Sequence, residues 1–120
     1  MTHKKLIDAY ATLMRMSTVQ IPIKAARDLY TIRKAIEPIY QFCAEQERVI
    51  VNGYNGKIAN GTISFDDEDN TKKAQKDLQD LYALEAEYGL DPVTVHLDDI
   101  INCKMSLNDM ETLDGFVVLV

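Results

Sequence analysis

The sequence has little of several residue types on which recognisable chemistry depends. It has no tryptophan, and its 120 residues include only two histidines, two cysteines, five glycines and three prolines. The histidines and cysteines are too scattered for zinc-ligand spacing. Glycine-rich phosphate loops, HExxH and G-x-S-x-G are also absent. We therefore predict a protein that is not an enzyme, with no catalytic residue, cofactor or metal ligand to nominate.

Long apolar runs are missing as well. No hydrophobic stretch approaches the roughly 20 residues that a membrane span needs, and the N-terminal sequence leads into no signal-peptide hydrophobic region. We expect no membrane association and a cytosolic setting. There Cys43 and Cys103 would be reduced, and a disulfide between them is the less favoured alternative.

Charge is unevenly placed along the chain. Residues 1–50 carry eight Lys or Arg and five Asp or Glu, a net +3, whereas residues 51–120 carry five and fourteen, a net −9. Because phosphates repel an acidic protein, nucleic-acid binding is disfavoured. A small nucleic-acid-binding module stays open as an alternative. It would use the basic residues Lys24, Arg27, Arg33 and Lys34, which we expect instead to face solvent or to attract the acidic half.

The first fifty residues contain two segments with helical periodicity. Apolar residues recur at helical spacing between Thr2 and Met16, with Thr2 as the expected N-cap. Between this helix and the next, residues 19–21 alternate between apolar and polar, which predicts a short strand.

A longer stripe begins at Pro22, a residue that suits a first helical turn. Its steps alternate between four and three residues, and its members are Ala25, Leu29, Ile32, Ile36, Ile39, Cys43, Gln46 and Ile50. Pro38 interrupts the stripe without changing its phase. We therefore expect one kinked helix over residues 22–51.

Residues 52–69 form an Asn- and Gly-rich connection. Asn52-Gly53 is expected to end the long helix, with the glycine in a left-handed cap. Asn60-Gly61 predicts a small hairpin of residues 57–59 and 62–64. The carboxylate run at residues 66–69 favours the positive N-terminus of a following helix. A cation site is the alternative, although the EF-hand ligand spacing is absent.

The remaining chain contains one more long helix and a strand-helix-strand segment. The pattern predicts an acidic amphipathic helix over residues 70–88, closed by Gly89. Residues 91–120 follow, with an alternating strand at Val93–Leu97 and a capping box at Ser106–Asp109. The apolar run Phe116–Val120 must be buried, most simply as a strand beside Val93–Leu97, with burial in a partner as the alternative.

These elements predict an α+β fold, mostly α, in a single domain over residues 1–120. Residues 22–51 and 70–88 would pack as an antiparallel helical hairpin because both carry an apolar stripe. The N-terminal helix and a small β-sheet would close one end of this hairpin. The apolar stripes of the two helices would then be buried.

The order of these segments resembles a family of small uncharacterised proteins from phages and prophages of Gram-positive bacteria. The similarity covers almost the whole chain, from "LIDAYATL" through "IPIKAARDLYTIRKAIEPIY" and "VTVHLDDI" to "SLNDMETLDGFVV". Its most telling part is the entry into the long helix, residues 21–26. The resemblance implies a viral origin and no known enzymatic role.

We therefore expect a non-enzymatic phage or prophage protein that binds other proteins in the cytoplasm of a host cell. Its partner would belong to one of two classes. The first is a phage structural protein, with a virion (tail-region) assembly or accessory role and virion association. The second is a host defence enzyme that the protein inhibits. For inhibition, clustered carboxylates would imitate nucleic-acid phosphates. The candidate interaction surface comprises Asp66, Asp67, Glu68, Asp69, Asp77, Asp80, Glu85 and Glu87. A self-assembling structural protein, with a second copy as partner, is another alternative.

Overall fold

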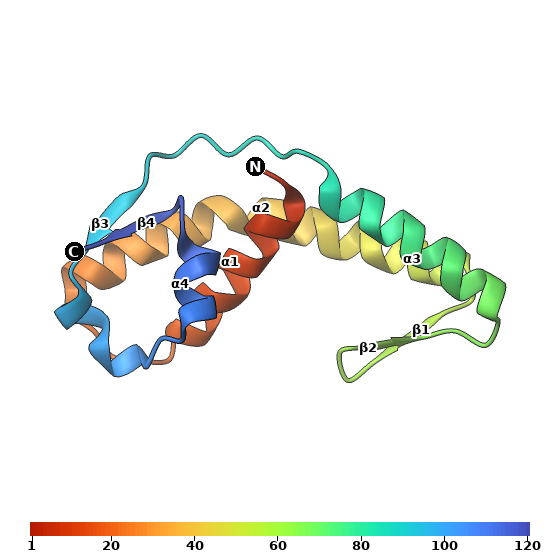
Figure 1. Cartoon of the computed structure of the whole chain (residues 1–120), viewed down its shortest axis with the longest axis horizontal. Coiled ribbons are helices and arrows are strands. Elements are labelled where there is room, and N and C mark those ends of the chain that lie inside the picture. The colour runs from red at the N-terminus through yellow and green to blue at the C-terminus, as the bar shows by residue number, and fades with distance from the viewer.

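The computed structural model describes residues 1–120 and is mostly helical (Figure 1). In chain order its elements are α1 His3–Met16, α2 Ile23–Gly53, β1 Lys57–Ala59, β2 Thr62–Ser64, α3 Glu68–Ala83, β3 Val93–Val95, the 3-10 helix η1 Leu97–Cys103, α4 Leu107–Leu113 and β4 Val117–Leu119. The expected fold class, α+β and mostly α, is confirmed. None of the helices combines the length and apolar character that crossing a bilayer requires.

The helix α1 begins where the sequence predicts. The Thr2 hydroxyl accepts a hydrogen bond from the Lys5 backbone N–H at 3.2 Å, which satisfies one of the free donors of the first turn. Its apolar stripe, including Leu6, Ala9 and Leu13, is buried against α2 and the C-terminal segment. The segment at residues 19–21 is not a strand, because no other strand lies beside it to pair with.

The helix α2 continues without interruption through Pro38, as the unchanged phase of its stripe predicts. The expected kink at Pro38 stays a prediction. The helix ends at Gly53, but the expected left-handed glycine cap is wrong. The left-handed residue is Asn55, with φ 57°, which asparagine tolerates better than most side chains. At this end of the stripe the fully buried residue is Val51 rather than its half-buried neighbour Ile50.

The predicted hairpin is confirmed. Ile58 in β1 pairs with Ile63 in β2 in an antiparallel ladder. Asn60 and Gly61 both have positive φ, 53° and 75°, as a type I′ turn requires. Both strands are largely exposed, and the hairpin lies beside the end of α2 (Figure 1).

The helix α3 packs antiparallel along the second half of α2, so the predicted helical hairpin forms (Figure 1). Its predicted bounds are wrong, because it runs over Glu68–Ala83 and not 70–88. Asp67 caps the helix and starts it early. At the other end, the backbone pairs with the N-terminus: the N–H of His3 donates to the Leu84 carbonyl at 2.8 Å, and the N–H of Ala86 donates to that of Met1 at 2.7 Å.

Residues after α3 therefore run as extended chain, and the cap expected at Gly89 does not form. Tyr88 lies outside the helix. Its ring packs edge-on against that of Phe116, with centroids 5.1 Å apart. Phe116 is fully buried in the core, so this contact fixes the extended segment across the C-terminal part of the fold.

The C-terminal run pairs beside the predicted strand. Strands β3 and β4 form a parallel pair in which Val93 lies opposite Val117 and Val95 opposite Leu119. The strand β3 ends at Val95, two residues earlier than predicted, because the 3-10 helix η1 begins at Leu97. The capping box of α4 is present: the Ser106 hydroxyl accepts from the Asp109 N–H, and the Asp109 carboxylate accepts from the Ser106 N–H.

The core lies where α1, the first half of α2 and the C-terminal segment meet. Ile32 on α2 is 0% exposed and Leu81 on α3 is 6% exposed, so these positions of the predicted stripes are buried, whereas Ile39, Gln46 and Ile50 of the α2 stripe are half-buried. Cys43 and Cys103 are free thiols, as expected, with no disulfide. The distal part of α2, the β1–β2 hairpin and α3, residues 39–83, project from this core as a helical arm (Figure 1).

Candidate functional site

The predicted acidic surface begins with four carboxylates at the tip of the arm. Asp66, Asp67, Glu68 and Asp69 are all exposed. The Asp67 carboxylate accepts a hydrogen bond from the Asp69 backbone N–H at 2.8 Å. It satisfies a free donor at the start of α3, and its charge faces the positive end of that helix. The structural role expected for this run is thus present.

The two acidic residues further along α3 differ in their surroundings. The Asp77 carboxylate accepts a hydrogen bond from the Tyr54 hydroxyl at 2.7 Å, so it faces the end of α2 and is half-buried. Asp80 is exposed. Between them and the tip lie three exposed lysines, Lys72, Lys73 and Lys76.

These lysines are the charged residues that the sequence-based prediction of an acidic surface left out. Lys72 follows Glu68 by four residues, Lys73 follows Asp69 by four, and Asp80 follows Lys76 by four. Residues four apart lie next to each other on a helix surface. The solvent face of α3 therefore carries charges of both signs. The phosphates of a nucleic acid, by contrast, are all negatively charged.

Glu85 and Glu87 lie on the extended segment after α3, at the base of the arm. Glu85 forms an ion pair with the amino group of Met1 at 2.8 Å. Glu87 borders a shallow hollow that Phe42 and Ile39 also line. The eight predicted carboxylates therefore fall into separate groups: the tip, the side of α3 and the base.

The predicted basic residues also differ in their partners. Lys34 pairs with Glu37 at 2.9 Å. Lys24 and Arg27 are exposed on α2 and form no ion pair. Arg33 stands apart because its guanidinium lies 5.4 Å from the centre of the Tyr30 ring and borders a pocket.

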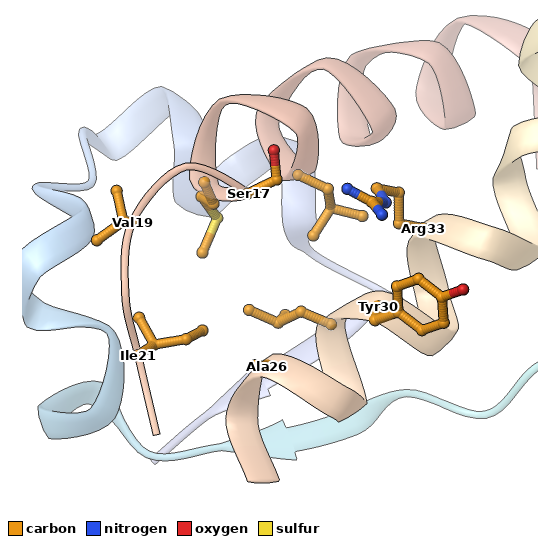
Figure 2. A pocket seen from close by; sticks show the side chains of 9 residues that line it. Ser17, Val19, Ile21, Ala26, Tyr30 and Arg33 are labelled. Carbon is orange, nitrogen blue, oxygen red and sulfur yellow. The ribbon is translucent and has the colours of Figure 1, made fainter. Parts of the chain in front are cut away.

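This pocket lies at the opposite end of the molecule from the arm, between the end of α1, residues 17–22 and the start of α2 (Figure 2). Its volume is about 180 Å³. Its apolar lining consists of Leu13, Met16, Val19, Ile21, Ala26 and Leu29. Residues 19–21 form no strand, yet their alternation survives: Val19 and Ile21 line the pocket while Gln20 is exposed.

Two polar residues of the pocket, Arg33 and Tyr30, lie at one end, and the third, Ser17, donates its hydroxyl to the Met14 carbonyl. Figure 2 shows Arg33 and Tyr30 next to each other at this end, and Val19 and Ile21 at the other. Arg33 is held by Tyr30 and by a weak hydrogen bond from its Nη1 to the Met14 sulfur at 3.8 Å. No acidic residue lines the pocket.

A larger hollow of about 520 Å³ lies between α1, α2 and the hairpin, and Cys43 contributes to its lining. Burial raises the pKa of the Cys43 thiol, and the nearby carboxylate of Glu47 raises it further. The thiol therefore stays protonated at neutral pH, whereas the thiolate is the nucleophilic form.

Two tyrosines connect the helices of the arm. The Tyr82 hydroxyl on α3 donates to the Glu47 carboxylate on α2 at 2.9 Å, and the Tyr54 hydroxyl donates to Asp77. The pKa of Tyr82 is raised, first by burial and then by this hydrogen bond. The pKa of Tyr54 is raised chiefly by its hydrogen bond to Asp77.

A third charged contact joins α1 to α4. Arg15 pairs with the buried carboxylate of Asp109 at 2.5 Å, and this contact lowers the pKa of Asp109. No group of three or more His, Cys, Asp or Glu side chains is placed to hold a metal ion.

No known protein family, curated protein or solved structure matches this chain. The resemblance to the phage and prophage family stays a prediction.

Proposed function

We propose that this protein acts by binding another protein through its helical arm, without catalysing a reaction. The observation that carries this proposal is the exposure of apolar side chains on the arm. Ile58 on the hairpin is 47% exposed, and Phe42 and Val49 on α2 are 51% and 55% exposed. Phe42 and Val49 are seven residues apart on α2, which places them on one face of the helix. We call this pair the arm face.

The shape of the molecule supports the proposal. Its extents are 49 × 28 × 21 Å and its radius of gyration is 16.5 Å, whereas a compact chain of this length has a radius of gyration of about 14 Å. The arm accounts for the difference because it projects from the core. An elongated protein of this size gives up burial for surface. Exposed apolar side chains that share one face of such a surface are typical of interaction sites, whereas single ones are ordinary on any protein surface.

The surroundings of the perturbed ionisable groups also support binding over catalysis. Tyr54, Tyr82 and Asp109 each owe part of their shifted pKa to a hydrogen bond between two elements of the fold. Such contacts hold elements together. They account for the shifts without a reacting group.

The partner classes expected from the sequence remain a phage structural protein or a host defence enzyme. Imitation of nucleic acid would need an unbroken row of negative charges, and the three lysines on the solvent face of α3 do not favour it. Salt dependence separates the two modes of binding. An interaction unchanged between low and high ionic strength would exclude mimicry and fit an apolar arm face.

The test compares two double variants, Phe42→Ser with Val49→Ser and Ile23→Ser with Leu107→Ser. The control residues lie outside the arm, at the starts of α2 and α4. They are 87% and 86% exposed, so the same apolar-to-serine change is made on the surface there. Proteins captured from extracts of the natural host are identified, and the binding of a purified partner is then titrated with each variant. We expect the arm variant to weaken binding at least about tenfold, as loss of two apolar contacts would, and the control to bind like wild type.

Equal binding by both double variants would refute the role of the arm face. Light scattering at tens of micromolar tests the alternative of self-assembly. A doubled mass that the arm variant abolishes would replace the separate partner with a second copy of the chain.

A further inference from the structure

We infer that the pocket between α1 and α2 binds one large apolar side chain of a partner protein that carries a carboxylate next to it. This site is separate from the arm face. The pocket lies where α1 ends and α2 begins, whereas the arm lies at the far end of α2 (Figure 1). The occupant follows from three properties of the pocket: its size, its lining and its charge.

The size of the pocket fits a single side chain. Its volume is about 180 Å³, and an apolar protein cavity of about 150 Å³ is large enough to hold benzene. A phenyl or leucine-like group therefore fills it, and an extended ligand does not fit inside.

The lining of the pocket favours an apolar occupant. Leu13, Met16 and Leu29 form a buried apolar floor, with exposed fractions of 3%, 4% and 6%. Val19 and Ile21 form a half-buried wall (Figure 2). Moving an apolar side chain from water onto these surfaces is favourable because it removes apolar area from solvent.

The charge of the pocket selects a neighbouring carboxylate. Arg33 is the only charged residue of the lining, and it takes part in none of the five ion pairs of the chain. Its guanidinium is positioned by Tyr30 and Met14, neither of which neutralises it. A carboxylate beside the apolar group can accept two parallel hydrogen bonds from the guanidinium.

The test uses capped tripeptides titrated into the isotope-labelled full chain, followed by NMR shifts of the Val19, Ile21 and Leu29 methyl groups. The first peptide has phenylalanine between two aspartates, the second phenylalanine between two lysines, and the third alanine between two aspartates. We expect saturable shifts with the first peptide. It should bind about tenfold or more tightly than the second, because the Arg33 contact is charge-assisted, and more tightly than the third, which lacks the apolar group.

Two single variants locate the charge effect. Arg33→Gln should abolish the preference for aspartate over lysine, whereas Arg27→Gln, the same change at an exposed position of α2 outside the pocket, should keep it. Ala26→Leu, which partly fills the pocket, should weaken the binding of the phenylalanine peptides.

Three results would overturn the inference. One is the absence of saturable shifts with the first peptide. Another is equal binding of the alanine and phenylalanine peptides, which means that charge alone acts. The last is an equal loss of preference in the Arg27 and Arg33 variants, which means that the charge acts at long range. None of these results depends on the arm face, which the Phe42 and Val49 variants test separately.

Discussion

Replacing Ile36 with alanine tests the packing on which the fold depends. Ile36 lies on α2, is 0% exposed and belongs to the core cluster together with residues of α1 and the C-terminal segment. The substitution removes three buried carbon groups, which at about 0.8 kcal/mol each cost about 2.4 kcal/mol in transfer free energy. The cavity left behind adds to this, so we expect a loss of about 3–4 kcal/mol in the free energy of unfolding.

The matched control is Ile23→Ala in the first turn of the same helix. It deletes the same three carbon groups from a side chain that is 87% exposed. Alanine is also the better helix former, by a few tenths of a kcal/mol. The control should therefore leave the free energy of unfolding within about 0.5 kcal/mol of wild type.

The measurement is urea unfolding monitored by the circular dichroism of the helices. The slope of the unfolding free energy against urea concentration is compared between the variants. An equal slope with a lower midpoint isolates the change in stability. The loss should also lower the Tm by about 10 °C or more. If Ile36→Ala changed stability no more than Ile23→Ala does, Ile36 would not be buried and the packing of α2 described above would be wrong.

Two further predictions concern pH. The pKa of Tyr82 is raised above its ordinary value of 10.0 in the folded protein, so the unfolded chain loses this proton at a lower pH than the folded chain does. The contribution of Tyr82 to stability should therefore be complete below about pH 10 and fall as the pH rises further. Tyr82→Phe should reduce this fall of the unfolding free energy, measured by urea unfolding between pH 8 and 11. The same dependence of stability on pH in the variant and in wild type would contradict the contact with Glu47. The pKa of Asp109 is lowered below 3.8 by Arg15, so its contribution should be complete above that pH and be lost as the pH falls further. Arg15→Gln should reduce this acid loss in thermal melts between pH 2 and 6, and an identical acid transition would argue against the ion pair.

Several features of the fold could be predicted because they depend on neighbouring residues alone. The Thr2 cap, the Asn60-Gly61 turn and the capping box of Ser106 and Asp109 each satisfy backbone groups a few residues away. The α2 stripe was also predictable through Pro38, because helical periodicity persists when a single hydrogen bond is lost.

The errors arose where a distant segment decides the local conformation. Residues 84–88 keep a helical pattern in the sequence. In the fold, however, the backbone groups of Leu84 and Ala86 bond to the N-terminus, and Tyr88 packs on Phe116. Residues 19–21 likewise alternate as a strand does, but no strand lies beside them. A strand needs a partner for its backbone hydrogen bonds, and local sequence cannot supply one.

The candidate sites show the same division. The sequence by itself determined which residues carry charge and which helix faces are apolar, because periodicity follows directly from the chain. Only the tertiary structure decided that the predicted carboxylates separate along the arm and that lysines lie between them. It also decided that Arg33 borders an apolar pocket, since the lining comes from α1, α2 and the segment between them. A pocket is a relation between elements, and its position is fixed by how their buried faces pack.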